Sequence, residues 1–188
     1  MLVALRDNGL YEIAGDMTTV QAFANNYKKY AFYPRSLILT PEGLPSFIQV
    51  TQLAIYNPSS HFFDLTYENP QKKRLFLQYR DLQGRLWISK TNSLSYLENN
   101  IEHEIPTEHF PLLKEEITCM LDAGNNQLLL SPKGYGLCLW NGVQLSPPLT
   151  SAQNLPGNYC KRLITHDGEI WVVCSNGVAE IGIDHGQP

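Results

Sequence analysis

Two aspartates, Asp81 and Asp167, each stand just before a glycine and a tryptophan, and together they could supply a pair of carboxylates. Glycoside hydrolysis needs two carboxyl groups at a defined separation, so such a pair is a possible catalytic centre. The surroundings of the aspartates repeat, however, with Gly84 and Trp87 after the first and Gly168 and Trp171 after the second. We therefore expect both aspartates to cap backbone amides in equivalent turns rather than to carry out catalysis.

The two tryptophans, Trp87 and Trp171, occupy equivalent places in two apolar strands. A tryptophan can stack on a sugar ring, but large aromatic side chains also fill the space between packed elements, and we expect packing here. Several other residues could line a carbohydrate-binding face: Tyr27, Tyr30, Phe32, Tyr33, Phe62, Phe63, Tyr67, Tyr135, Asn25 and Asn26. Since most of these side chains must also fill the interior, we nominate no ligand-binding residue from the sequence.

The segment at 102–109 concentrates acidic and imidazole side chains in the order EHEIPTEH. It lacks the HExxH spacing of a zinc helix, and Pro106 argues against a helix through its middle. Alternation along a strand would place His103 on the face opposite to Glu102 and Glu104. We expect a solvated outer strand here, and we predict neither a metal site nor a cofactor.

All four cysteines lie in the last third of the chain, and each falls within an apolar strand pattern: Cys119, Cys138, Cys160 and Cys174. No two of them have the spacing of a zinc ribbon, which favours small buried side chains. Cys119 and Cys160 nevertheless occupy almost the same place in successive copies of a sequence repeat. Equivalent positions can be close in space, so a disulfide between them stays possible in an oxidising compartment.

The repeat extends over the whole chain with a period of about 42 residues. The first apolar position of each copy is Leu2, Pro45, Leu86, Leu128 and Ile170, so the steps are 43, 41, 42 and 42 residues. A second apolar strand begins eight residues after each anchor, with one extra residue in the fourth copy. A polar turn with a small residue, such as Gly43, usually precedes the anchor, because a tight hairpin requires a positive φ.

Each copy holds four short apolar runs separated by turn signals, and almost none of them has helical spacing. In the fourth copy these runs are 117–121, 127–131, 136–140 and 143–146, with Asn141-Gly142 joining the last two. Asn-Gly between alternating apolar segments is a strong hairpin signal. Four antiparallel strands at this period predict an all-β fold in which each copy is one blade of a β-propeller.

The order of the strands indicates about four and a half blades. Innermost strands are expected at 36–39, 74–79, 117–121 and 161–165, so the chain opens on the second strand of one blade and closes on the third strand of another. We interpret residues 1–188 as a single propeller segment, either an excerpt of a six- to eight-bladed propeller, which we favour, or a five-bladed ring. An excerpt would expose strand edges and apolar blade faces, and we expect it to self-associate through them.

Two copies carry a detailed motif. Residues 155–178, LPGNYCKRLITHDGEIWVVCSNGV, and residues 81–90, DLQGRLWISK, resemble the two-component regulator propeller repeat. The chain lacks the Gly-His and Trp-Asp pairs of WD40 repeats and the Gly-Gly pair of kelch repeats. It departs from the family pattern where the Gly-Thr after tryptophan is replaced by Val173-Cys174 or Ser89-Lys90, and where Val3, Ser46 and Leu129 replace the tryptophan itself.

The resemblance implies the periplasmic or other extracytoplasmic sensor region of a hybrid two-component histidine kinase. Many such sensors respond to oligosaccharides, so an oligosaccharide is the ligand that the family implies, although the motif does not specify one. We find no phosphate-acceptor region, nucleotide loop or receiver, and we expect the chain to receive a signal without catalytic activity. Two alternatives remain open, a five-bladed glycosidase and a protein-interaction scaffold.

Composition excludes some partners. The chain has 188 residues, 43% hydrophobic and 17% charged, with a net charge of −4 and a pI near 5.7. Nucleic-acid binding needs a clustered positive surface, which this balance does not favour. No stretch reaches the roughly 20 apolar residues of a membrane helix. The first apolar run, Met1 to Leu5, is interrupted at once by Arg6, so we expect neither a membrane span nor a signal peptide in this sequence.

Overall fold

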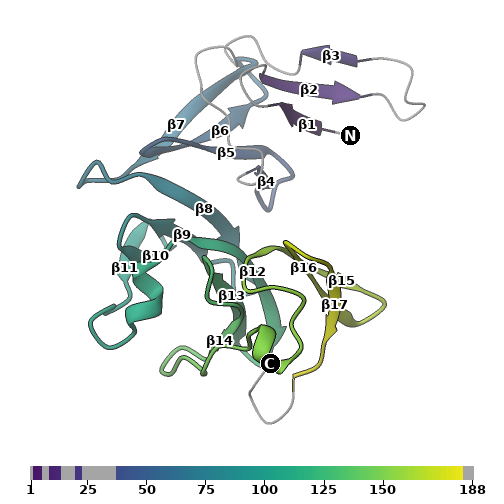
Figure 1. The fold of residues 1–188 in the computed structure, drawn as a ribbon. Helices are drawn as coiled ribbons and strands as arrows, with labels where there is room; N and C mark the ends of the chain where they lie inside the picture. The colour runs from purple at the N-terminus through teal and green to yellow at the C-terminus, as the bar shows by residue number, and fades with distance from the viewer. Residues whose placement is uncertain (1, 6–8, 14–19, 23–36, 184–188) are drawn as a thin grey trace. The chain divides into compact units, whose positions relative to one another are not determined.

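The fold is known from a computed structural model that describes residues 2–5, 9–13, 20–22 and 37–183. Apart from two short 3-10 helices, η3 (Pro111–Lys114) and η4 (Ser151–Gln153), the regular structure in these ranges is β-strand (Figure 1). The strands form five separate antiparallel sheets of three or four strands each. The predicted all-β fold is confirmed. Position 36, the residues at 25–33 and His185 lie outside the described residues.

The chain divides into two compact units, Met1–Gln78 and Tyr79–Pro188, and the boundary falls inside one strand, β8 (Leu75–Arg80). The first unit holds a three-stranded sheet in the order β1-β2-β3, formed by Leu2–Leu5, Gly9–Ile13 and Val20–Ala22. Its second sheet has the order β4-β5-β6-β7, formed by Ile38–Leu39, Pro45–Gln49, Gln52–Asn57 and Phe62–Glu68. Phe47 packs edge-on against Phe63, with ring centroids 4.7 Å apart, in the core of this second sheet.

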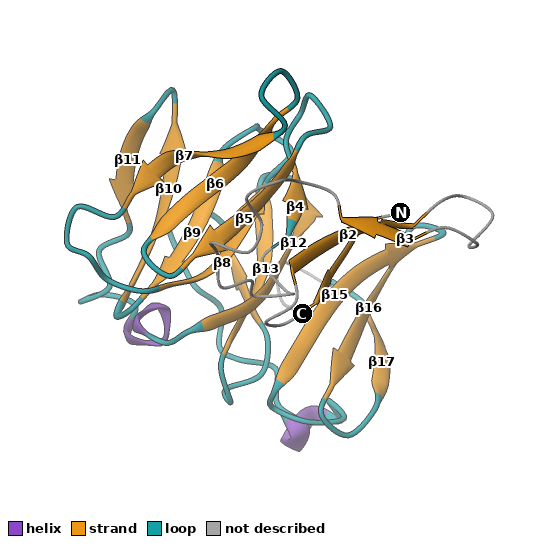
Figure 2. Cartoon of the chain, turned by 90° about the horizontal axis from the view of Figure 1, so that it is seen from above, coloured by secondary structure: helices purple, strands orange, loops and turns teal. Residues whose placement is uncertain are grey.

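The second unit contains three sheets (Figure 2). The first has the order β11-β10-β9-β8, with β9 at Leu86–Lys90, β10 at Ser93–Glu98 and β11 at Ile101–Glu104. The next is β12-β13-β14, at Ile117–Gly124, Gln127–Pro132 and Cys138–Trp140. The last is β15-β16-β17, at Cys160–His166, Glu169–Cys174 and Val178–Ile181. In chain order the five sheets have three, four, four, three and three strands. The predicted three-stranded sheets at both ends are present, but only two of the three predicted full blades have four strands.

Contacts between neighbouring sheets of the second unit join residues that are about one repeat apart. The Thr118 hydroxyl donates to the Cys160 carbonyl at 2.5 Å across 42 residues. The Tyr79 hydroxyl donates to Asp122 Oδ2 at 2.9 Å across 43 residues. Because the separation equals the period, equivalent positions of consecutive copies lie side by side, as blades of a propeller require.

A buried apolar layer lies between the sheets β12-β14 and β15-β17. Leu129, Leu137 and Val172 are fully buried in it, together with Leu139 and Leu163. The layer follows alternate positions along the chain, as in Leu137 and Leu139 or in Ile170 and Val172, because every second side chain of a strand lies on one face. Burying one such side chain stabilises the fold by about 1.5–3 kcal/mol, so this layer holds the two sheets together.

The fourth copy departs from the predicted strand order. Residues 143–146 form no strand, and the chain instead makes isolated bridges from Leu145 to Trp140 and from Leu149 to Leu137. The expectation of a regular fourth strand here is therefore wrong. Pro147 and Pro148 follow at once, and a proline has no N–H with which to continue a ladder.

No helix in the described part of the chain is both long and apolar enough to cross a membrane.

Candidate functional site

The side chain of Asp81 is fully buried at the turn between β8 and β9, and every acceptor position on it is used. Its Oδ1 accepts the backbone N–H groups of Gln83 and Arg85 at 3.1 and 2.8 Å. Its Oδ2 accepts Trp87 Nε1–H and Arg85 Nε–H, both at 2.7 Å. A carboxylate held by four donors is unable to act as an acid or base without losing them, so Asp81 caps a turn and fixes an indole.

Trp87 begins a row of three rings in contact across the β8–β11 sheet. It lies opposite Tyr96, which lies opposite His103, and the ring centroids are 5.0 and 4.9 Å apart. The Arg85 guanidinium lies over both Trp87 and Tyr96, at 5.4 and 5.2 Å from the ring centroids. Trp87 is 1% exposed, and its role is packing, as expected from the repeat.

Asp167 does not match Asp81. Its side chain is exposed, its φ is +52°, and its carboxylate lies 3.4 Å from His166 Nε2 without capping any described amide. The expected equivalence is wrong because Asp81 stands six residues before its tryptophan and Asp167 only four. Thr165 is the residue six positions before Trp171, and the buried Nε1 of Trp171 has no hydrogen-bond partner.

The three repeat glycines have the backbone that their turns require. Gly43, Gly84 and Gly168 have φ values of +78°, +83° and +85°, with open space where a Cβ would lie. At 167–168 both turn residues have positive φ, which is the conformation of a two-residue hairpin. These glycines therefore shape turns.

The acidic segment at 101–104 forms the outer strand β11, and its alternation is as predicted. Glu102 and Glu104 lie on the face opposite to His103, and both form ion pairs with Lys90, Glu104 at 3.4 Å. Lys90 is only 3% exposed and was not recognised from the sequence. Its position at the end of an otherwise apolar strand was the available signal, because a buried ammonium needs carboxylate partners.

The four cysteines are buried thiols, in agreement with the preferred interpretation of the sequence. Burial raises the pKa of Cys138 to about 12. Burial, followed by the neighbouring Cys174 and Cys119 thiols, also raises the pKa of Cys160. Since the thiolate is the reactive form, the Cys138 and Cys160 thiols react slowly in the folded chain.

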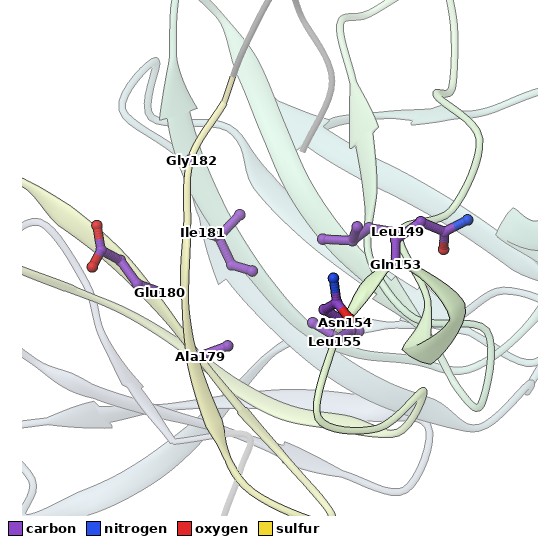
Figure 3. A pocket seen from close by; sticks show the side chains of 8 residues that line it. All are labelled: Leu149, Gln153, Asn154, Leu155, Ala179, Glu180, Ile181 and Gly182. Carbon is purple, nitrogen blue, oxygen red and sulfur yellow. The ribbon is translucent and has the colours of Figure 1, made fainter.

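A hollow of about 200 Å³ lies within the second unit, between the segment 149–155 and strand β17 (Figure 3). Its floor is aliphatic, with Leu149, Leu155 and Ile181, and Ile181 points toward Leu149 across the hollow, whereas Glu180 points to the other side of β17. Ligand pockets usually measure 300–1,000 Å³ and combine apolar walls with aromatic rings. This hollow therefore fits a single apolar side chain better than an oligosaccharide.

A second candidate surface is formed by the turns that end the hairpins of the last two sheets. Tyr135 is 45% exposed in the turn between β13 and β14. The next residue, Gly136, donates its N–H to the Asn158 carbonyl at 2.9 Å, and Ser175 N–H donates to the Tyr159 carbonyl at 3.0 Å. We call this the hairpin-end surface and define it by Lys133, Tyr135, Asn158, Tyr159, Ser175 and Asn176. An exposed aromatic ring among amides and hydroxyls is a surface that can stack on and hydrogen-bond to a sugar.

The repeating blades and the capped turns define the class of protein as a β-propeller. Comparison with solved structures supports this class. The chain is similar to the extracellular domain of the putative one component system BT4673 from B. thetaiotaomicron, with a TM-score of 0.70 and 18% identity. The match covers 93% of this chain and 25% of that domain, so the chain spans about a quarter of its length. The resemblance predicted from the repeat motif is thus confirmed at the level of the fold.

Two other propellers have the same fold. YCF48 bound to D1 peptide gives a TM-score of 0.72 at 10% identity, covering 94% of this chain and 58% of that one. Virginiamycin B lyase from Staphylococcus aureus gives a TM-score of 0.64 at 12% identity, covering 94% and 64%. No protein-family model matches the sequence, and a search of the curated proteins finds no significant match.

Proposed function

We propose that this chain is a non-enzymatic segment of an extracytoplasmic sensor β-propeller, which takes up a signal by binding an oligosaccharide. The observation that carries the proposal is the shared fold with the extracellular domain of BT4673, together with a repeat motif of the same family. We propose that residues 1–188 are a single propeller segment of a longer propeller, because the chain spans about a quarter of the BT4673 extracellular domain whose fold it shares.

The non-enzymatic part of the proposal rests on how the carboxylates are used. Asp81 is saturated by four donors, and Asp122 Oδ2 accepts both the Tyr79 hydroxyl and the Leu82 N–H, each at 2.9 Å. A glycosidase needs two carboxylates that can exchange protons with substrate. The shared fold with a lyase supports the alternative that the chain is an enzyme. The glycosidase alternative is tested by measuring whether the chain releases reducing ends from the glycans that bind to it.

The hairpin-end surface is the part of the second unit that we propose for sugar binding. Tyr135 offers a ring face, whereas most other aromatic side chains described in this unit pack against neighbouring residues. Asn158 Oδ1 accepts the Ser151 N–H at 2.7 Å, and this hydrogen bond fixes the loop that carries Asn158. A ligand held here would contact two consecutive blades, so binding would be coupled to how those blades pack.

Replacing Tyr135 with alanine is expected to weaken binding of the cognate oligosaccharide about tenfold, because one stacking contact contributes about 1–1.5 kcal/mol. The measurement is isothermal titration of the chain against a panel of neutral and acidic oligosaccharides. Val143→Ala is the matched control, because Val143 is exposed at the opposite end of a hairpin. Equal affinities of the two variants would exclude Tyr135 from the site. If no oligosaccharide of the panel bound to the chain, oligosaccharide sensing would be contradicted.

The last sheet offers a surface for self-association. In the β8–β11 sheet, Leu94 and Trp87 are 0% and 1% exposed. They lie on the face where Ser89 Oγ accepts the Ile117 N–H from the next sheet. The residue that corresponds to Leu94 in the last sheet is Val178, which lies opposite Val173 and is 58% exposed. That face of the β8–β11 sheet is covered by the next sheet of the chain. We propose that the corresponding face of the β15–β17 sheet is covered by a blade of a second copy of the chain.

Sedimentation should accordingly show an association that strengthens with concentration. Val178→Lys is expected to weaken it at least tenfold, because a charge placed in an apolar contact loses its hydration without gaining a partner. Val143→Lys, which adds the same charge at an exposed position far along the chain, should leave the association unchanged. A stable monomer at all concentrations would contradict this part of the proposal.

A further inference from the structure

Two of the buried thiols lie opposite each other on adjacent strands. Cys160 begins β15, Cys174 ends β16, and the two residues are direct partners in the antiparallel register. The Ser175 N–H donates to the Tyr159 carbonyl at 3.0 Å, which places the Cys160–Cys174 pair at a position without hydrogen bonds between the two residues themselves. At such positions the Cα atoms are only about 4.5 Å apart and the side chains are closest.

The two sulfur atoms are already in contact. Cys174 Sγ lies 3.7 Å from Cys160 Sγ. A disulfide has an S–S length of about 2.05 Å and Cα atoms about 4.4–6.8 Å apart, so rotation of the two side chains is enough to close the bond. Both residues belong to rigid strands, which keeps them at this separation.

From this geometry we propose that Cys160 and Cys174 are a disulfide-forming site, which joins the first two strands of the last sheet when the chain folds under oxidising conditions. The pairing differs from the one that the repeat left possible, in which Cys119 is the partner of Cys160. Cys119 Sγ faces the backbone carbonyl of Cys160, at 3.8 Å. Cys138 is buried in another strand, β14, where it lies opposite Leu130.

The reaction is thiol–disulfide exchange with a low-molecular-weight disulfide such as glutathione disulfide. The thiolate of one cysteine attacks the reagent and releases one reduced glutathione, and the second cysteine then attacks the mixed disulfide and releases another. The two protein thiols lose two protons and two electrons, and the reagent gains them. Because both sulfurs are buried once the sheets have packed, the bond forms during folding or local opening.

The bond would link two of the segments that form the hairpin-end surface. Cys160 directly follows Asn158 and Tyr159, and Cys174 directly precedes Ser175 and Asn176. A disulfide here removes freedom from the unfolded chain between two points 14 residues apart, and this stabilises the folded form. The oxidised chain should therefore unfold at a higher denaturant concentration than the reduced one.

The test is refolding of the full chain from denaturant with an excess of glutathione disulfide over glutathione. Free thiols are then counted under denaturing conditions, and the linked peptides are identified by mass spectrometry. We expect the wild-type chain to fall from four thiols to two, with Cys160 joined to Cys174. Both Cys119→Ala and Cys138→Ala should fall from three thiols to one, whereas Cys174→Ala should keep three.

Four remaining thiols in a chain with native circular dichroism, or a bond that joins Cys119 to Cys160, would overturn the proposal. If a variant refolds poorly, the same count is made on native chain incubated with the reagent at urea concentrations below the unfolding midpoint. Local opening then exposes the pair, and the absence of a bond under those conditions would equally contradict the assignment.

Discussion

Asp81→Ala is expected to lower the free energy of unfolding by about 3 kcal/mol or more, because it leaves buried donors without an acceptor. Two backbone amides, the Trp87 indole N–H and the Arg85 guanidinium all lose their partner in one substitution. Denaturant unfolding followed by tryptophan fluorescence, which reports on Trp87 together with Trp140 and Trp171, measures the effect.

Asp167→Ala is the matched control for that experiment. The two aspartates have similar sequence surroundings, but Asp167 is exposed and caps no described amide, so its removal should change stability by less than about 0.5 kcal/mol. A large and equal loss in both variants would show that the turn sequence, and not the burial of Asp81, determines the effect.

Gly136→Ala should be similarly severe, with a loss of about 3 kcal/mol. Gly136 has a φ of +91°, and a Cβ there would overlap the carbonyl oxygen of Leu149, which is part of the backbone and is held by hydrogen bonds to Leu137. A positive φ costs an alanine about 1–2 kcal/mol, and forcing the backbone apart adds about 1–3 kcal/mol. Thermal unfolding of the variant measures the sum.

The neighbouring Gly134 separates the two causes. It has a φ of +84° but open space around the position of a Cβ, so Gly134→Ala should show only the conformational cost of about 1–2 kcal/mol. Equal losses for the two variants would mean that the segment at 149–150 moves aside easily and that the close approach at Gly136 is not a constraint.

The repeat period predicted most of the fold. Anchors about 42 residues apart, alternating strands and glycine turns located nearly all strands of the described chain and the order in which the sheets open and close. The failure at 143–146 has a local cause, since apolar alternation there is followed by Pro147 and Pro148, which stop a ladder whatever the preceding residues favour.

The candidate site was less predictable, because it depends on distances between copies. The sequence equated Asp167 with Asp81 from composition, although the spacing to the tryptophan already distinguished them. Lys90 was missed because its carboxylate partners lie on another strand. The repeat left a bond from Cys160 to Cys119 on the neighbouring sheet possible, whereas strand register places Cys174 opposite Cys160. Register depends on how two strands pair around their turn, and the position of a cysteine within the repeat does not give it.

The hydrogen bond from Thr118 to the Cys160 carbonyl, which spans one whole copy, limits how such a protein can lengthen. Duplication of a complete copy returns a hydroxyl and a carbonyl to the same relation, so genetic recombination can add blades without disturbing those already present. An insertion of half a copy would instead bury both groups unsatisfied. The buried hydrogen bond between Thr118 and Cys160 thus favours lengthening by whole copies of the repeat.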